Sequence, residues 1–122
     1  MIKIDFNKQN EKRITITGKS DSFHANVKDI TYITYEGSVS IVHLANERKY
    51  SISHSLKYFE ENLKNDSFFK VHRNTLINTE YINGTQTTHR ERSVNINGIN
   101  IKASRRRIAL LKKFLCGKLP FL

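Results

Sequence analysis

The sequence predicts a mainly β protein built from small antiparallel sheets, with one short helix near residues 54–64 and a C-terminal helix near residues 105–115. Three observations predict this class. Apolar and polar residues alternate over several short stretches, as in half-buried strands. The apolar period changes to about 3.6 residues in only two places, which indicates two helices. Turn-forming residues divide the chain at short intervals.

The first part of the chain predicts three strands. Each has apolar residues at every second position, and the segments between them are rich in Asn, Gly, Asp and Ser, which favour turns. The strands are expected at residues 1–6, 13–17 and 23–27.

The next part predicts a hairpin, a further strand and the first helix. Residues 30–44 are read as two strands joined at Glu36-Gly37-Ser38, and residues 48–53 as another strand. From there the apolar residues follow helical spacing, with Ser53 or Ser55 available as the N-cap. The expected buried stripe consists of Leu56, Phe59 and Leu63.

Residues 68–82, with the sequence FFKVHRNTLINTEYI, enclose a polar and cationic cluster between apolar residues. Asn83-Gly84 then predicts a turn. The clearest local signal is Asn97-Gly98, which supplies the positive φ angles that a two-residue hairpin turn requires. Val94 and Ile96 mirror Ile99 and Ile101 across it.

The final helix is predicted to begin after an N-cap at Ser104. Its apolar stripe is Ile108, Leu111 and Leu115, and Gly117 and Pro120 are expected to end it. We see no repeat or linker, so we expect residues 1–122 to form a single domain.

Charge is concentrated in the second half of the chain. The formal net charge is +10; residues 1–69 carry 10 Lys/Arg and 9 Asp/Glu (+1), and residues 70–122 carry 11 and 2 (+9). An excess of this kind favours a polyanionic partner or a membrane surface, with simple solubility as the alternative. Because the cations cluster at the ends of elements and do not follow one amphipathic helix face, we expect nucleic acid and no membrane partner. The sequence has no apolar run long enough to span a bilayer, no secretory signal and one cysteine, Cys116, so we expect a cytoplasmic protein without an internal disulfide.

Catalytic and metal-binding patterns are not found. No CxxC, HxxxH, phosphate-binding glycine loop or nucleophile motif occurs, so we expect no enzyme activity, cofactor or metal site. Cys116, near the end of the Lys-rich helix, is expected to serve in packing. The five histidines are scattered along the chain: His24, His43, His54, His72 and His89.

Two cationic clusters are candidates for binding nucleic acid. His72, Arg73 and Asn74 bring side chains that bond phosphates and base edges to one loop. The alternatives are a strand-end histidine and an asparagine that bonds its own backbone. Residues 102–107, KASRRR, place three arginines at a helix N-terminus, where the helix dipole disfavours cations and an anionic partner would offset the cost. The alternative is a solvated charge run.

These residues together resemble the LytTR family of bacterial DNA-binding domains, the output domains of response regulators, over most of the chain. The resemblance implies an elongated, almost all-β fold whose inter-strand loops enter successive major grooves and bend the DNA. It places DNA contacts in three segments. Their residues are His72, Arg73 and Asn74; Lys102, Ser104, Arg105, Arg106 and Arg107; and the turn at Gly37 and Ser38, which lacks the histidine of some relatives.

The resemblance also implies partners. We expect double-stranded DNA with paired direct repeats, bound by two copies of a chain that is a monomer when free, and a receiver domain or upstream sensor outside these residues. We therefore predict sequence-specific DNA binding by a transcriptional regulator. The alternatives are an RNA-binding β module, in which Phe23, Tyr32 and Tyr35 would stack on bases, and a partner-binding domain without affinity for nucleic acid.

Overall fold

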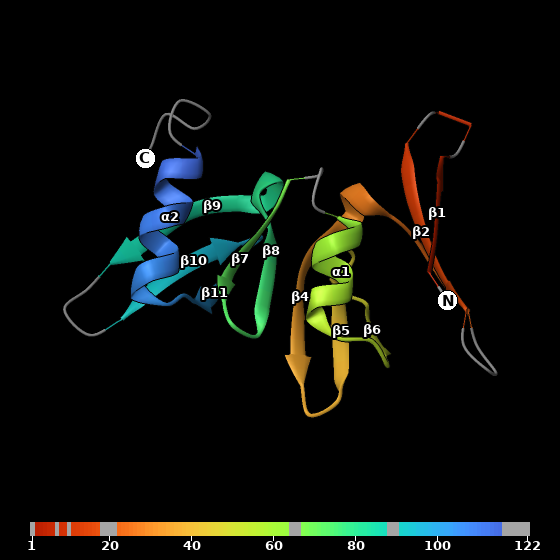
Figure 1. The fold of residues 1–122 in the computed structure, drawn as a ribbon. Helices are drawn as coiled ribbons and strands as arrows, with labels where there is room; N and C mark the ends of the chain where they lie inside the picture. The colour runs from red at the N-terminus through yellow and green to blue at the C-terminus, as the bar shows by residue number, and fades with distance from the viewer. Residues whose placement is uncertain are drawn as a thin grey trace.

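The structure is a computed structural model that describes residues 2–6, 8–9, 11–17, 22–63, 67–87 and 91–115. Its elements form three antiparallel sheets and two α-helices (Figure 1). In chain order they are β1 (Ile2–Phe6), β2 (Lys12–Thr17), β3 (Ser22–Asn26), the 3-10 helix η1 (Val27–Asp29), β4 (Ile30–Glu36), β5 (Val39–Leu44), β6 (Lys49–Ile52), α1 (Leu56–Asn62), β7 (Phe68–His72), β8 (Thr75–Asn78), the 3-10 helix η2 (Thr79–Tyr81), β9 (Ile82–Thr87), β10 (Arg92–Ile96), β11 (Ile99–Lys102) and α2 (Arg105–Leu115).

The predicted mainly β class and both predicted helices are confirmed. Ser55 is the N-cap of α1, where its side chain accepts a hydrogen bond from the backbone N–H of Tyr58. Leu56 and Phe59 of α1 are buried, as is Leu63 just beyond it. Ile108, Leu111 and Leu115 form the buried stripe of α2. Gly117, Pro120 and Cys116 lie outside the described residues.

The five-stranded sheet, in the order β6-β5-β4-β8-β7, separates two hydrophobic cores. Leu76 of β8 packs in the core that contains α1 and the N-terminal sheet, whereas the next residue, Ile77, packs in the core that contains α2 and the third sheet. Successive side chains of a strand point to opposite faces of its sheet, so β8 is buried on both sides. All four of its residues are buried for this reason, and they do not show simple alternation.

The third sheet has the order β11-β10-β9 and packs with α2 and β7. The predicted hairpin register is confirmed, since Val94 pairs with Ile101 and Ile96 with Ile99. Asn97 and Gly98 have φ angles of 51° and 90°, as the tight turn requires.

The predicted turn at Asn83-Gly84 is wrong, because both residues lie inside β9. Gly84 pairs with Asn95 and lies outside the positive φ region, and the pairing then shifts at a bulge so that Ile96 faces Ile82. The chain turns earlier, in the 3-10 helix η2 between β8 and β9, where the Asn78 side chain accepts a hydrogen bond from Glu80 N. Pairing with β10 thus overrides the local turn preference of Asn-Gly.

Candidate nucleic-acid interface

The β7–β8 turn presents the first cationic cluster. Arg73 and Asn74 are exposed, whereas His72 is half-buried at the end of β7. The Asn74 backbone N–H donates to Nδ1 of His72 at 3.3 Å, so the ring supports the turn. The Asn74 carbonyl accepts from the Tyr35 N–H at 2.9 Å, which fixes the turn against β4. His72 therefore occupies the end of a strand, as the alternative interpretation of this residue expects. Arg73 and Asn74 are exposed to solvent.

The segment between β11 and α2 presents the second cluster. Ser104 is the N-cap of α2, since its Oγ accepts a hydrogen bond from Arg107 N at 3.2 Å and its carbonyl accepts from Ile108 N at 2.9 Å. Lys102, Arg105 and Arg106 are exposed. Arg107 is half-buried and borders a hollow with Glu60 and Phe69, so it faces the protein more than its two neighbours do.

The two clusters lie side by side, although about 30 residues separate them in the chain. The Ser104 N–H donates to the Val71 carbonyl at 2.9 Å, which places the first turn of α2 beside the end of β7. The positive end of the α2 dipole and the side chains of Arg73, Arg105 and Arg106 thus belong to one region of the surface. This arrangement suits a ligand with repeated negative charges.

The β4–β5 turn lies at the same end of the five-stranded sheet. β4 extends through Glu36, which pairs with Val39, so the turn consists of Gly37 and Ser38 alone. Both are exposed, and Gly37 has a φ of 64°. Because Tyr35 is bonded to Asn74, this turn is adjacent to the β7–β8 turn; Figure 1 shows both at the lower edge of the view, toward which the N-terminal end of α2 also points.

Sequence reasoning missed Tyr35 as a residue that positions the β7–β8 turn. The contact depends on the pairing of β4 with β8, whose residues are about 40 positions apart, and no local pattern predicts it. It also missed buried Asn78, which donates to the Ile30 carbonyl at 2.8 Å and accepts from Ser67 Oγ at 2.7 Å. Asn78 thereby joins β8 to the start of β4. The sequence signal that could have identified Asn78 was its position directly before a turn, where asparagine side chains often bond the backbone.

The aromatic residues considered for base stacking do not form an exposed platform. Phe23 is buried, and Tyr35 is half-buried. Tyr32 is stacked on His43, with ring centroids 3.9 Å apart, and burial raises the pKa of its hydroxyl. Single-stranded nucleic acid is bound by exposed rings, so these three residues give no support to the RNA alternative.

The described residues contain no group of three or more His, Cys, Asp or Glu side chains placed to hold a metal ion. No helix among them is long and apolar enough to cross a membrane.

Comparisons with known proteins identify the family and the fold of the chain. The family model described as "LytTr DNA-binding domain" matches residues 20–116. Among solved structures, the chain is similar to the LytTr DNA-binding domain of a putative methyl-accepting/DNA response regulator from Bacillus cereus. The TM-score is 0.71 at 22% sequence identity, covering 84% of this chain and 95% of that chain. A search of curated proteins found no match. With four-fifths of its length matched by the family model, the chain belongs to the LytTR family of DNA-binding domains.

Proposed function

We propose that this chain is the sequence-specific, double-stranded DNA-binding part of a cytoplasmic bacterial transcriptional regulator. The observation that carries the proposal is the hydrogen bond between Ser104 and Val71, which brings two cationic segments together at one end of the fold. Family membership supports DNA as the ligand. The proposed contacts come from loops between elements, and these loops enter the major groove.

The proposed roles follow from exposure and chemistry. Asn74 and Arg106 read base edges, because an amide pairs with both edge groups of adenine and a guanidinium pairs with guanine. Arg73, Arg105 and Lys102 bind phosphates and give the affinity its salt dependence. His72 and Ser104 hold the two loops in position, and Arg107, being half-buried, contributes mainly to the local positive potential.

The turn at Gly37 and Ser38 makes a weaker contribution. Neither residue carries a charged or amide side chain, and the neighbouring Glu36 is exposed. A carboxylate is repelled by phosphate unless it accepts from a cytosine amino group. We therefore propose a backbone or hydroxyl contact to phosphate here.

The proposed operator is a pair of direct repeats occupied by two copies of the chain, and the resulting bending of the DNA adds indirect readout. A receiver domain or upstream sensor, outside these residues, supplies the regulatory signal.

Selection of bound duplexes from a random pool tests the proposal. We expect one enriched motif, repeated in the same orientation at a fixed spacing. Duplex binding without any enriched motif would contradict sequence specificity. Displacement of the selected duplex by an equal concentration of single-stranded RNA would favour the RNA alternative.

A further inference from the structure

β1 is the outer strand of the N-terminal sheet, whose order is β1-β2-β3. It pairs with β2 over five consecutive residues, from Ile2 opposite Ile16 to Phe6 opposite Lys12. Among the strands that the structure describes, none pairs with the other edge of β1. Figure 1 shows β1 at the end of the molecule opposite α2. Both β1 and β2 precede residue 20, where the family match begins.

An open strand edge of this kind is a site for pairing with another strand, because it presents unpaired backbone N–H and C=O groups. β1 lacks the proline and the bulge that commonly protect such edges. The Phe6 side chain at its end is 61% exposed, more than any other large apolar side chain among the described residues. Within the part of the chain that the structure describes, β1 therefore combines an edge that no strand covers with an exposed apolar group.

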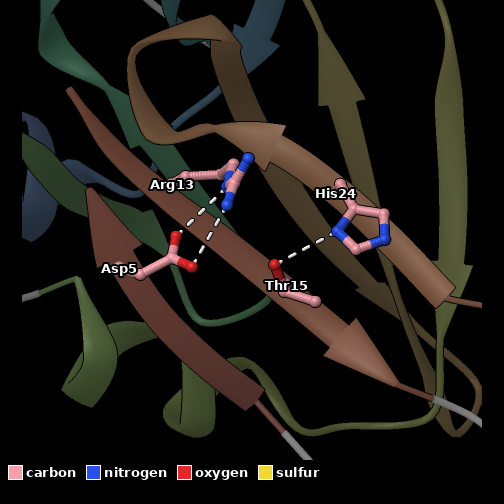
Figure 2. Close-up of polar contacts among 4 residues, drawn as sticks. All are labelled: Asp5, Arg13, Thr15 and His24. Carbon is pink, nitrogen blue, oxygen red and sulfur yellow. Dashed lines mark hydrogen bonds and ion pairs between the residues drawn. The ribbon is translucent and has the colours of Figure 1, made fainter. Parts of the chain in front are cut away.

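The edge is firmly held by the rest of the sheet. Ile14 and Ile16 of β2 are buried in the core that contains α1 and the N-terminal sheet. Arg13 of β2 donates two hydrogen bonds to Asp5 of β1, at 3.1 and 3.2 Å, and Thr15 of β2 is bonded to His24 of β3 at 3.2 Å (Figure 2). These contacts fix β1 relative to the core, so little ordering would be needed when a second strand pairs with it.

We propose that β1 pairs antiparallel with β1 of a second copy of this chain, with Ile4 opposite Ile4 of the second copy. The sequence of the strand is complementary to itself in this register only. Lys3 then faces Asp5 of the second copy, and Ile2 faces Phe6. Centring the pair on Lys3 or Asp5 would instead set like charges directly opposite each other, which is destabilising.

Within one chain Arg13 and Asp5 are cross-strand partners, as are Lys3 and Thr15. Joining two sheets at β1 brings residue 3 of the second copy opposite Asp5, on the edge of β1 that faces away from β2. The result is a continuous six-stranded sheet with an isologous contact.

The distribution of charge allows this contact. Residues 1–69 carry a net charge of +1, whereas residues 70–122 carry +9. Two copies that meet at β1 approach through the nearly neutral half of the chain, and their cationic clusters stay apart and available.

The symmetry of the contact has a consequence for DNA. Two domains on direct repeats have the same orientation, whereas the β1 contact relates its two domains by a two-fold axis. The β1 contact therefore joins domains that are bound at separate sites, and it does not join the two halves of one direct repeat.

Charge exchange at β1 tests the proposal, with oligomeric state measured by sedimentation. Wild-type chain is expected to dimerise as its concentration rises, which differs from the free monomer expected from the sequence. Lys3→Glu places carboxylates opposite Asp5, and Asp5→Lys places ammonium groups opposite Lys3; each variant is expected to weaken the homodimer by about tenfold or more. An equimolar mixture of the two variants is expected to form heterodimers, because every facing pair is then of opposite charge.

Lys8→Glu is the matched control. It makes the same charge change beyond the end of β1, at an exposed residue, and is expected to leave dimerisation unchanged. Circular dichroism of each variant verifies that the fold is retained. A wild-type dissociation constant weaker than about 1 mM would overturn the proposal. A mixture of the two variants that stays monomeric would overturn it as well.

DNA binding provides an independent readout. Lys3→Glu is expected to bind an isolated half-site with wild-type affinity and to lose the ability to bridge two duplexes. If bridging persists in this variant, the β1 contact is not its cause and the proposal fails. The proposed DNA-binding function is tested separately by the random-pool selection, so the two failures are distinguishable.

Discussion

The backbone N–H of Ser104 donates a hydrogen bond to the carbonyl of Val71 at 2.9 Å. Ser104 is the N-cap residue of α2, and Val71 lies one residue before the end of β7, so this bond joins the two segments that carry the cationic clusters. The same serine caps α2 through its side chain. One residue thus orients the helix and places it beside the β7–β8 turn.

Loss of a base-reading side chain is expected to weaken specific binding. Asn74→Ala and Arg106→Ala should each cost about 1–3 kcal/mol of binding free energy for the selected duplex, because each removes a contact to one base pair. Fluorescence anisotropy at fixed salt measures the change. Arg48→Ala, at an exposed position away from the β4–β5 turn, is the control and should bind as wild type does. Wild-type affinity in Asn74→Ala would show that Asn74 is not a contact.

Loss of a phosphate contact should act on all duplexes alike. Lys102→Ala is expected to reduce the slope of log K against log salt by about one and to weaken specific and non-specific duplexes similarly. Titrations at several salt concentrations provide the slope. Lys113→Ala, in the last turn of α2, removes the same charge far from the N-terminus of the helix and should leave the slope unchanged. Equal slopes for both variants would contradict the assignment of Lys102.

Substitution of Ser104 separates helix capping from DNA binding. Ser104→Ala removes the cap of α2 and should lower the free energy of unfolding by about 0.5–2 kcal/mol. Ser104→Asp retains a capping oxygen and adds a negative charge, so it should keep stability but weaken DNA binding. Chemical denaturation and anisotropy give the two quantities. Unchanged DNA affinity in Ser104→Asp would place Ser104 outside the interface.

Stability is expected to fall at mildly acidic pH because of His43. Burial lowers the pKa of His43, and nearby Lys49 adds to this effect, while Glu36 opposes it. The unfolded chain, with a pKa of about 6.5 at this residue, therefore binds the proton more readily than the folded chain does. The free energy of unfolding should therefore decrease as pH falls through about 6.5. Below the folded-state pKa of His43, this residue should cause no further decrease.

The variant His43→Phe tests whether His43 causes this pH dependence of stability. The substitution retains a ring that can stack on Tyr32 and removes the titrating group, so the slope of the unfolding free energy between about pH 6.5 and pH 5 should become smaller. Denaturation curves measured across this range provide the slope. A slope equal to that of the wild type would assign the pH dependence to other groups.

Local patterns were sufficient for most of the secondary structure. The Asn97-Gly98 hairpin and its register, the two helices and the serine that caps each are set by interactions within a few residues, and all are confirmed. The pattern failed at Asn83-Gly84, where an isolated dipeptide favours a turn but pairing with β10 keeps the chain extended. The strand β9 was missed for the same reason: it is stabilised by pairing with β10, which its own residues do not reveal.

The amino-acid sequence determined the class of fold, the two cationic segments and the self-complementary strand β1, because charge, periodicity and turn chemistry are properties of neighbouring residues. Only the tertiary structure decided that these cationic segments meet, through the bond from Ser104 to Val71, and that Tyr35 secures the turn at Asn74. It also decided that Arg105 and Arg106 are exposed while Arg107 is half-buried. Such relationships depend on the pairing of β4 with β8 and the packing of α2 on β7, contacts between residues about 30–45 positions apart that no local pattern encodes.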